Sequence, residues 1–411
     1  MTASLRHAAG SLMVVGLAGT ELTPLERAWL KLLRPAGIIL FRRNIANARQ
    51  TRSLLTEATA LCAPHSLRCV DVEGGTVNRL RDALAPMPSV QAVAKKALDA
   101  TLSLPLTQMR KDGARGDGDP TLLRPSRRTQ KDGAPSGAML MREHGELIAR
   151  AVKAFGFNAT LAPVLDLRLP ASAAVMGTRC AAPHADGVSM YAKAFLTGLA
   201  LQKVAGCGKH FPGLGGGALD SHLETPSIRE GFRELWNHDL APYCELRDRL
   251  PMVMVNHAAY PDTPGRDRPA SVSSFWIQEV LRKRIGFRGI VLSDDLEMGG
   301  ILKFMPIEEA AVEAIRAGTD LVEICHSPEM ILRAYEGLVR EAESSRAFRL
   351  LLMNRAREVS KKRRKLFPSG TPAALSPARL EALRERILRY GATIGEFPAP
   401  SHALQTKAEM A

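Results

Sequence analysis

The feature of this sequence that most limits its fold is a series of short apolar segments with helical patterns between them. Two of those helical patterns are Ile277–Arg284 and Ile307–Ala317. Alternation of strands and helices is typical of βα units, which assemble around a parallel sheet. Eight such units predict an α/β fold of the (β/α)8-barrel type. The expected strands are Leu12–Gly16, Gly37–Phe41, Arg68–Asp71, Ala159–Pro163, Val204–His210, Met252–His257, Gly289–Asp294 and Asp320–Ile324.

An insertion interrupts this alternation between the third and fourth expected strands. The stretch Leu104–Gly137 is rich in Gly, Pro, Arg and Asp, and it carries the sequence Lys-Asp-Gly-Ala twice. Two copies without an apolar face do not make a repeat protein, so we interpret the stretch as a flexible inserted loop.

The C-terminal part of the chain also departs from the βα pattern. We expect a barrel over residues 1–345 and a basic helical extension over residues 346–411. Within the extension, Ser376-Pro377 is a helix-start signal. The residues that follow predict a helix whose apolar face packs on the outside of the barrel. That face is formed by Leu380, Leu383, Ile387 and Leu388.

Three features bear on where the protein works. The apolar stretch Ala8–Leu17 could belong to a weak signal peptide, but it leads straight into the capped helix start Thr23–Glu26, so we interpret it as the first barrel strand. No apolar run approaches the roughly 18 residues of a spanning helix, so we expect no membrane span. Six cysteines without C-x-x-C spacing are typical of reduced, mostly buried thiols, which favours a cytoplasmic protein.

Much of the formal net charge of +14 lies near the C-terminus. The run Arg355–Lys365 holds seven basic residues and one acidic residue. Such a run usually forms a solvated helix end, and no aromatic side chains interleave it to stack on bases. We therefore expect no nucleic-acid partner, although a positive field can attract an anionic substrate.

Polar residues follow the ends of several expected strands. In a (β/α)8 barrel the active site lies at the carboxyl ends of the strands, so these side chains should meet at one mouth. They supply carboxylates, imidazoles and a lysine, which are groups that bind a polar ligand. The residues are Asp71, Glu73, Asp166, Lys209, His210, His257, Asp294 and Asp295.

The seventh expected strand ends in two adjacent aspartates, Asp294 and Asp295. Because side chains alternate across a strand, we do not expect both to point into the mouth. One is a candidate nucleophile or base, and the other is expected to cap the following turn. On this motif alone, a second interpretation stays open, in which both only cap a helix.

A glycine-rich loop follows the fifth expected strand and leads to the triplet Asp220-Ser221-His222. Residues two apart in an extended loop fall on the same side, so the Asp220 carboxylate can hydrogen-bond the His222 imidazole and raise its basicity. The alternative is a loop histidine without a role.

The same loop formally matches a dinucleotide fingerprint at Gly213-x-Gly215-x-x-Ala218. Pro212 precedes it and no helical pattern follows, so we expect no dinucleotide cofactor. A metal ion is not expected either, because the histidines lack H-x-H spacing on an early strand and H-E-x-x-H spacing anywhere.

Six blocks lie in an order that resembles a known family. The blocks are Gly37–Asn44, Asp71–Arg79, Gly156–Asp166, Lys209–Gly213, the triplet at 220–222 and Ser293–Met298. Together they resemble family 3 glycoside hydrolases, specifically the β-N-acetylglucosaminidase branch of bacterial cell-wall recycling. The resemblance runs from about Leu12 to about Leu338, apart from the insertion.

The resemblance implies a retaining exo-glycosidase that removes β-linked N-acetylglucosamine from peptidoglycan fragments through a glycosyl-enzyme intermediate. It implies that Asp294 is the nucleophile and that His222, supported by Asp220, is the acid/base. The residues that it assigns to sugar binding are Asp71, Arg79, Arg179, Lys209 and His210. Retaining hydrolysis needs a nucleophile and a separate proton donor. A histidine donor would suit an anionic substrate, because an imidazole does not repel negative charge as a second carboxylate would.

Some residues depart from the family pattern. Leu214 and Gly216 stand where a histidine and a polar residue are usual, and Val72 and Thr76 replace the common glutamine and arginine. These changes leave the implied nucleophile and acid/base in place, but leaving-group contacts or loop ordering could differ.

Three other functions remain open at this point. A β-glucosidase of the same family usually carries a C-terminal sandwich domain and a carboxylate acid/base, whereas this chain has a short helical extension and the triplet. A phosphorylase would use phosphate in place of water, which a histidine acid/base tolerates. A non-catalytic sugar-binding barrel would need neither Asp294 nor His222.

Overall fold

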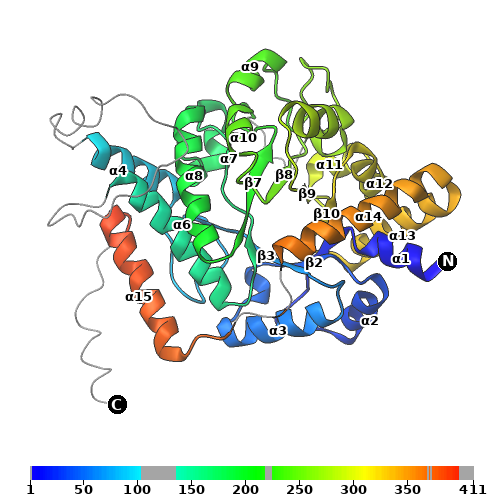
Figure 1. The fold of residues 1–411 in the computed structure, drawn as a ribbon, viewed down its shortest axis with the longest axis horizontal. Coiled ribbons are helices and arrows are strands. Elements are labelled where there is room, and N and C mark those ends of the chain that lie inside the picture. Colours follow the sequence, from blue (N-terminus) through cyan, green and yellow to red (C-terminus); the bar gives the residue numbers. More distant parts are fainter. Residues whose placement is uncertain (1, 103–135, 218–224, 368–369, 371–372, 398–411) are drawn as a thin grey trace, which may run out of the picture.

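Residues 2–102, 136–217, 225–367, 370 and 373–397 are described in the computed structural model. Strands occupy its centre and helices surround them (Figure 1). Nearly all of the predicted insertion lies outside the described residues, as does the triplet at 220–222.

The eight predicted strands all form and close into a parallel barrel, so the predicted fold class is confirmed. Around the barrel they follow the order β1-β10-β9-β8-β7-β6-β3-β2, in which neighbours along the chain pair and β1 closes against β10. The strands are β1 Met13–Val15, β2 Gly37–Leu40, β3 Leu67–Val70, β6 Ala159–Thr160, β7 Ala205–Phe211, β8 Met252–Val255, β9 Ile290–Asp295 and β10 Leu321–Ile324. A small antiparallel hairpin, β4 (Val72–Gly74) and β5 (Val77–Asn78), follows β3 directly.

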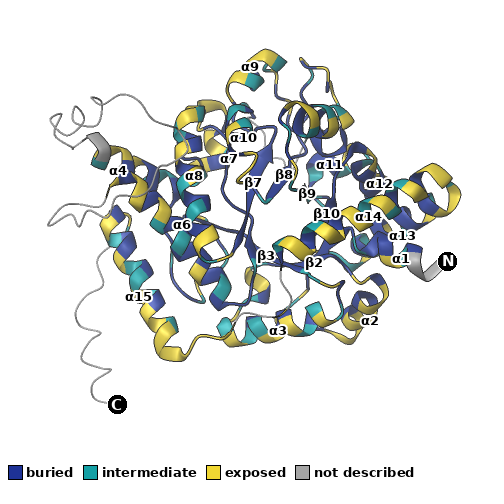
Figure 2. Cartoon of the chain, viewed as in Figure 1, coloured by how far each residue is buried: buried dark blue, intermediate teal, exposed yellow. Residues whose placement is uncertain are grey.

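Helices with one apolar face cover the barrel, because each strand is buried on both sides and needs an outer layer. Figure 2 shows the buried strands and the exposed outer faces of the helices. The α-helices are α1 Thr2–Gly10, α2 Pro24–Leu33, α3 Ala48–Ala60, α4 Val90–Leu102, α6 Gly137–Ala154, α7 Ala173–Met176, α8 Ala185–Leu201, α9 Phe232–Asn237, α10 Ala241–Leu246, α11 Gly299–Leu302, α12 Ile307–Ala317, α13 Pro328–Ser344, α14 Arg346–Leu366 and α15 Pro377–Ile394. Wider or tighter helical turns are η1 Arg42–Asn44, η2 Pro170–Ser172, η3 Gly177–Arg179, η4 Ala270–Val272 and η5 Phe275–Arg284.

Local sequence signals explain several helix ends. Thr23 caps α2 through a capping box with Glu26, and Pro24 occupies the first turn. Ser376 caps α15 in the same way, by accepting from the backbone N–H of Arg379. The predicted apolar face of α15 packs on α6, where the hydroxyl of Tyr390 donates to the carbonyl of Leu140.

The N-terminal apolar stretch is part helix and part strand. Its first residues end α1, and only Met13–Val15 form the first barrel strand, so the interpretation of Ala8–Leu17 as one strand was too broad. The helix packs on α13 and α14. No helix within the described part of the chain is long and apolar enough to cross a membrane. All six cysteines are free thiols, and five of them are buried.

The basic run lies in α14, which packs at the end of the barrel where the strands begin, here called the lower end. The prediction of a solvated helix end is wrong for part of this run. Arg355 and Lys362 both contact the buried carboxylate of Asp320, at 3.0 Å and 2.8 Å. Arg363 is only 2% exposed and donates to the carbonyl of Ala36. These cations therefore hold the helix against the barrel. The domain boundary at residues 345 and 346 stays a prediction.

Candidate active site

A cavity of about 430 Å³ opens at the carboxyl ends of the barrel strands. Six of the eight site residues expected from the sequence line it, namely Asp71, Arg79, Arg179, Lys209, His210 and Asp294. The other lining residues are Ile39, Phe41, Glu73, Val77, Leu161, Val175, Met176, Leu214, Met254, Asp295, Met298, Glu323, Cys325 and His326. The predicted mouth is therefore real, and the remaining two site residues, Asp220 and His222, lie outside the described part of the chain.

The β4–β5 hairpin brings Arg79 back beside Asp71. The backbone N–H of Arg79 donates to the carbonyl of Asp71 (3.1 Å), and its guanidinium lies 3.8 Å from the Asp71 carboxylate. The ammonium of Lys209, from β7, donates to the other carboxylate oxygen of Asp71 at 2.9 Å. Two cations, one directly after β5 and one on β7, therefore hold this carboxylate in the cavity lining.

Glu73 is a buried carboxylate that binds two cations of the cavity lining, Arg179 and Lys209. Arg179 binds it with two hydrogen bonds of 2.8 Å, and Lys209 lies 2.7 Å away. Burial alone would raise the pKa of Glu73, but the charges and hydrogen bonds of Arg179 and Lys209 lower it well below its usual value. The carboxylate is therefore ionised, and it fixes both cations before any ligand arrives.

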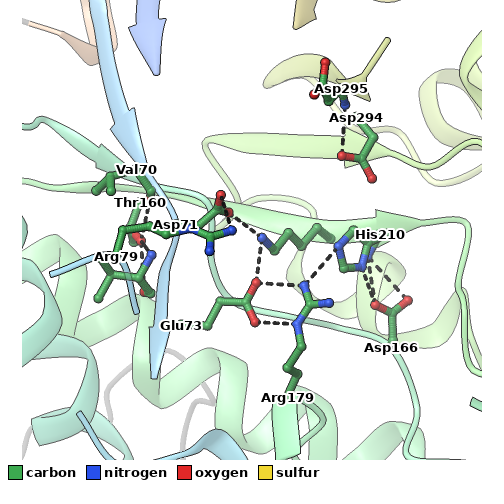
Figure 3. A network of polar contacts seen from close by, with 12 residues as sticks. Val70, Asp71, Glu73, Arg79, Thr160, Asp166, Arg179, His210, Asp294 and Asp295 are labelled. Carbon is green, nitrogen blue, oxygen red and sulfur yellow. Dashed lines mark hydrogen bonds and ion pairs between the residues drawn. The ribbon is translucent and has the colours of Figure 1, made fainter. Parts of the chain in front are cut away.

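His210 is oriented by Asp166, a pairing visible in Figure 3. The ring Nδ1 lies 2.6 Å from Asp166 Oδ2, and the same carboxylate accepts from the backbone N–H groups of His210 and Leu214. If Nδ1 donates to this carboxylate, Nε2 is left as an acceptor, and Arg179 Nη2 lies 3.4 Å from it.

Lys209 and His210 both line the cavity although they are neighbours on β7. The pairing of β7 with β8 shifts register between Gly208 and Phe211. This irregularity lets two successive side chains reach the same mouth, which regular strand alternation would not allow.

Asp294 turns its carboxylate toward His210, whereas Asp295 turns away (Figure 3). One oxygen of Asp294 accepts from the backbone N–H of Asp295 at 2.9 Å. Burial would raise the pKa of Asp294, but the charges of His210, His257 and Lys209 and this hydrogen bond lower it. Asp294 is therefore a half-buried, ionised carboxylate that no arginine or lysine of the described residues neutralises by direct contact, which suits a nucleophile.

Asp295 caps the following turn, as predicted for one of the two aspartates. Its Oδ1 accepts from the backbone N–H of Glu297 at 3.0 Å. Burial, together with the charges of Glu297 and Asp294, raises the pKa of Asp295 to about 7. Asp295 also lines part of the cavity. Both aspartates therefore reach the mouth, although strand alternation predicted that only one would.

His257 supports the end of β9 and does not line the cavity. It is fully buried, with Nδ1 2.7 Å from the hydroxyl of Ser271 and Nε2 3.0 Å from the carbonyl of Asp295. Its predicted place in the mouth is therefore wrong, because the ring is used to hold the backbone that carries the aspartates.

Glu323 is a cavity residue that sequence reasoning missed. It lies on β10 opposite Asp295, is 1% exposed, and its Oε1 has no hydrogen-bond partner within the described residues. Burial and the charges of Asp71, Asp295 and Asp294 raise its pKa well above the usual value. The available signal was an ionisable residue in the middle of an otherwise apolar strand.

The described residues before and after the predicted triplet have defined contacts. On one side, Leu214 lines the cavity. On the other side, the hydroxyl of Thr225 donates to the carbonyl of Gly300 in α11, shortly after the cavity residue Met298. The positions of Asp220 and His222 themselves are outside the described residues.

Comparisons with known proteins agree on one family. The model of the glycosyl hydrolase family 3 N-terminal domain matches residues 4–361. A β-hexosaminidase of Bordetella avium is 35% identical over 77% of this chain and 81% of its own length, and one of Idiomarina loihiensis is 32% identical over 76% and 83%. Among solved structures, NagZ from Neisseria gonorrhoeae is 27% identical, with a TM-score of 0.69 over 95% of this chain and 98% of that one. A family 3 β-N-acetylglucosaminidase from Paenibacillus sp. str. FPU-7 is also 27% identical, with a TM-score of 0.76 over 94% and 68%.

Proposed function

The chain belongs to glycosyl hydrolase family 3, and from this premise we propose that it is a retaining exo-β-N-acetylglucosaminidase with Asp294 as its nucleophile. The observation that carries the proposal is the ionised carboxylate of Asp294 in a cavity whose opposite side is held by Lys209, Arg179 and His210. The β-hexosaminidase names of the relatives support the choice of an N-acetylated sugar.

In this proposal, the sugar lies between Asp294 and the ion-paired side of the cavity. Asp71, Arg79, Lys209, Arg179 and His210 offer fixed acceptors and donors to its hydroxyl groups. Because Glu73 and Asp166 already hold the lysine, the arginine and the histidine, these groups reorganise little when the substrate binds. The anomeric carbon is thereby presented to Asp294.

The reaction then follows a double displacement. Asp294 attacks the anomeric carbon while an acid protonates the departing oxygen, and water later cleaves the glycosyl-enzyme ester with the same group as base. We assign the acid/base role to His222, with Asp220 as its partner, on the motif and on the position of Leu214, earlier in the same loop, in the cavity lining.

Asp295 is the rival acid among the described residues, because its pKa of about 7 suits proton transfer. Its Oδ1 already accepts from the backbone N–H of Glu297, and its carboxylate points away from that of Asp294. This geometry disfavours Asp295 as the proton donor.

The finer parts of the proposal concern substrate and place. A peptidoglycan fragment is the proposed natural substrate, because the resemblance is to the cell-wall recycling branch. A cytoplasmic location is proposed because all six cysteines are free thiols.

The test compares an aryl β-N-acetylglucosaminide with the matching aryl β-glucoside. We expect clear preference for the acetamido sugar, and equal or reversed rates would overturn the branch assignment. Repeating the assay with and without inorganic phosphate separates the hydrolase from a phosphorylase, because only the latter releases the sugar 1-phosphate. His222→Ala should slow substrates with poor leaving groups most, and unchanged rates on them would refute its role as acid.

A further inference from the structure

A recess of about 340 Å³ lies at the opposite end of the barrel from the catalytic mouth. It is formed where α1 leads into β1, where α2 leads into β2 and where α3 leads into β3, and α14 closes its remaining side. Its lining residues are His7, Ala8, Ser11, Arg34, Ala63, Pro64, Met353, Ala356, Arg357, Ser360 and Arg363. None of these lining residues is acidic, whereas four can carry positive charge.

Of the four lining residues that can carry positive charge, Arg363 is the buried one. Its side chain donates from Nη1 to the carbonyl of Ala36 at 2.8 Å, but its Nε has no partner within the described residues. Burial lowers the pKa of Arg363 to about 10, and only the Cys62 thiol acts in the other direction. The guanidinium is therefore charged at neutral pH, although no carboxylate of the described residues pairs with it.

The same helix carries two other cations that are partly buried, Arg355 and Lys362. Lys362, which directly precedes Arg363, and Arg355, about two turns earlier, both contact the carboxylate of Asp320. A buried charge without a partner is costly, and such charges are normally paired. Arg363 is thus an exception on a helix that otherwise follows the rule.

Two exposed arginines complete the recess. Arg34 ends α2 and Arg357 lies on the exposed side of α14, and neither is in an ion pair with a described residue. Serine hydroxyls of Ser11 and Ser360 line the same space. Guanidinium groups bind phosphate oxygens in pairs, and they are weakly hydrated, so they suit a phosphate group in a half-buried recess.

We propose that this recess, formed by Arg34, Arg357 and Arg363, is a binding site for the phosphate group of a small molecule. All three arginines line one recess, and none of its lining residues is acidic, which favours a compact oxyanion over an extended polyanion that would track an open stripe of charge. The site is separate from the glycosidase mouth, and the proposal does not depend on the sugar specificity.

The experiment titrates the full-length protein with inorganic phosphate and with glycerol 3-phosphate by calorimetry, at an ionic strength held constant with sodium chloride. We expect saturable binding of one equivalent. The double variant Arg34→Glu/Arg357→Glu should weaken it at least about tenfold, because each change replaces an attractive charge by a repulsive one. Both residues are exposed, so the variant should fold, and its unfolding midpoint verifies this.

Arg364→Glu is the matched control, because Arg364 is exposed on the same helix but does not line the recess. It makes the same change in charge per site and should leave the affinity within about twofold, since exposed charges beyond the site are screened. Arg363→Lys keeps the charge but removes the fork, and it should weaken binding of both probes.

Each possible result of the titration either supports the proposed phosphate site or overturns it. Equal affinity for the two probes supports a site that recognises the phosphate alone, and tighter binding of the ester supports one that also contacts the organic part. Absence of saturable binding overturns the proposal, as does binding that the double variant leaves unchanged. The protein could also bind heparin but neither probe. If the double variant and Arg364→Glu then weaken retention on heparin equally, the surface binds polyanions diffusely, and the proposed site is refuted.

Discussion

The two ends of the barrel handle buried charge in different ways. At the mouth, Asp71 and Glu73 are matched by cations, while the half-buried Asp294 and Asp295 and the buried Glu323 have no direct arginine or lysine partner among the described residues. At the lower end, the single carboxylate of Asp320 is surrounded by Arg282, Arg355 and Lys362. Burying a carboxylate is tolerable when cations surround it, so unmatched carboxyls at the mouth indicate a region whose charges serve chemistry rather than folding.

The largest effect expected from this comparison is on the mouth carboxylate Asp294. Asp294→Asn should reduce kcat by about 10³- to 10⁵-fold, because the side chain would no longer attack the anomeric carbon. Its unfolding midpoint should decrease only slightly, since the surroundings mildly favour the charged form. Steady-state hydrolysis of an aryl β-N-acetylglucosaminide measures the first effect and thermal unfolding the second. Retained turnover would remove Asp294 from its proposed role.

The carboxylate at the lower end should behave in the opposite way. Burial would raise the pKa of Asp320, but Arg282, Lys362 and Arg355 lower it, so it is ionised among three cations. Asp320→Ala leaves those cations without an anion and should cost about 3–5 kcal/mol of unfolding free energy. Denaturant unfolding measures this loss, and kcat of the folded fraction should stay near that of the wild type. A loss of activity without a loss of stability would contradict the division between the two ends.

Asp295 has no direct arginine or lysine partner among the described residues, and its Oδ2 lies 3.5 Å from Nε2 of His326. This carboxyl should make stability depend on pH. Its folded pKa of about 7 lies above the unfolded value of about 4, so the folded state holds a proton that the unfolded state releases. The contribution of this proton to the unfolding free energy is therefore complete below about pH 4 and is lost as the pH rises toward 7. Asp295→Asn should remove this loss, which amounts to at most about 4 kcal/mol for a shift of this size.

The measurement is the difference in unfolding free energy between wild type and variant from pH 4 to pH 8. Asp267→Asn is the control, because Asp267 is exposed, and its difference from the wild type should not change with pH. A difference for Asp295→Asn that is also constant with pH would show that its carboxyl titrates normally.

Much of the fold and the mouth could be predicted from the sequence, because both depend on local patterns. The alternation of apolar strands with capped helices was sufficient for all eight strands. The positions that follow the strands were sufficient to place Asp71, Lys209, His210 and Asp294 in one cavity.

The errors share a physical cause, which is that burial of a polar side chain depends on packing between distant segments. Nothing local distinguishes His257, which supports the backbone of β9, from His210, which lines the cavity. Glu323 was hidden inside an apolar strand pattern. Within the basic run, only contact with Asp320 and Ala36, far away in sequence, separates inward cations from solvated ones.

The smallest expected effects come from that basic run, where two adjacent lysines should differ. Lys362 donates to the carbonyl of Gly289 and to Asp320, whereas Lys361 is exposed and pairs with the exposed Glu358. Lys362→Ala should cost about 1–2 kcal/mol, because hydrogen bonds to a buried charge are lost but two cations still hold Asp320. Lys361→Ala removes the same charge and should leave the unfolding midpoint unchanged, since solvent screens exposed pairs. Equal losses for the two lysines would mean that net charge, and not contact with the lower end of the barrel, is what the run contributes to stability.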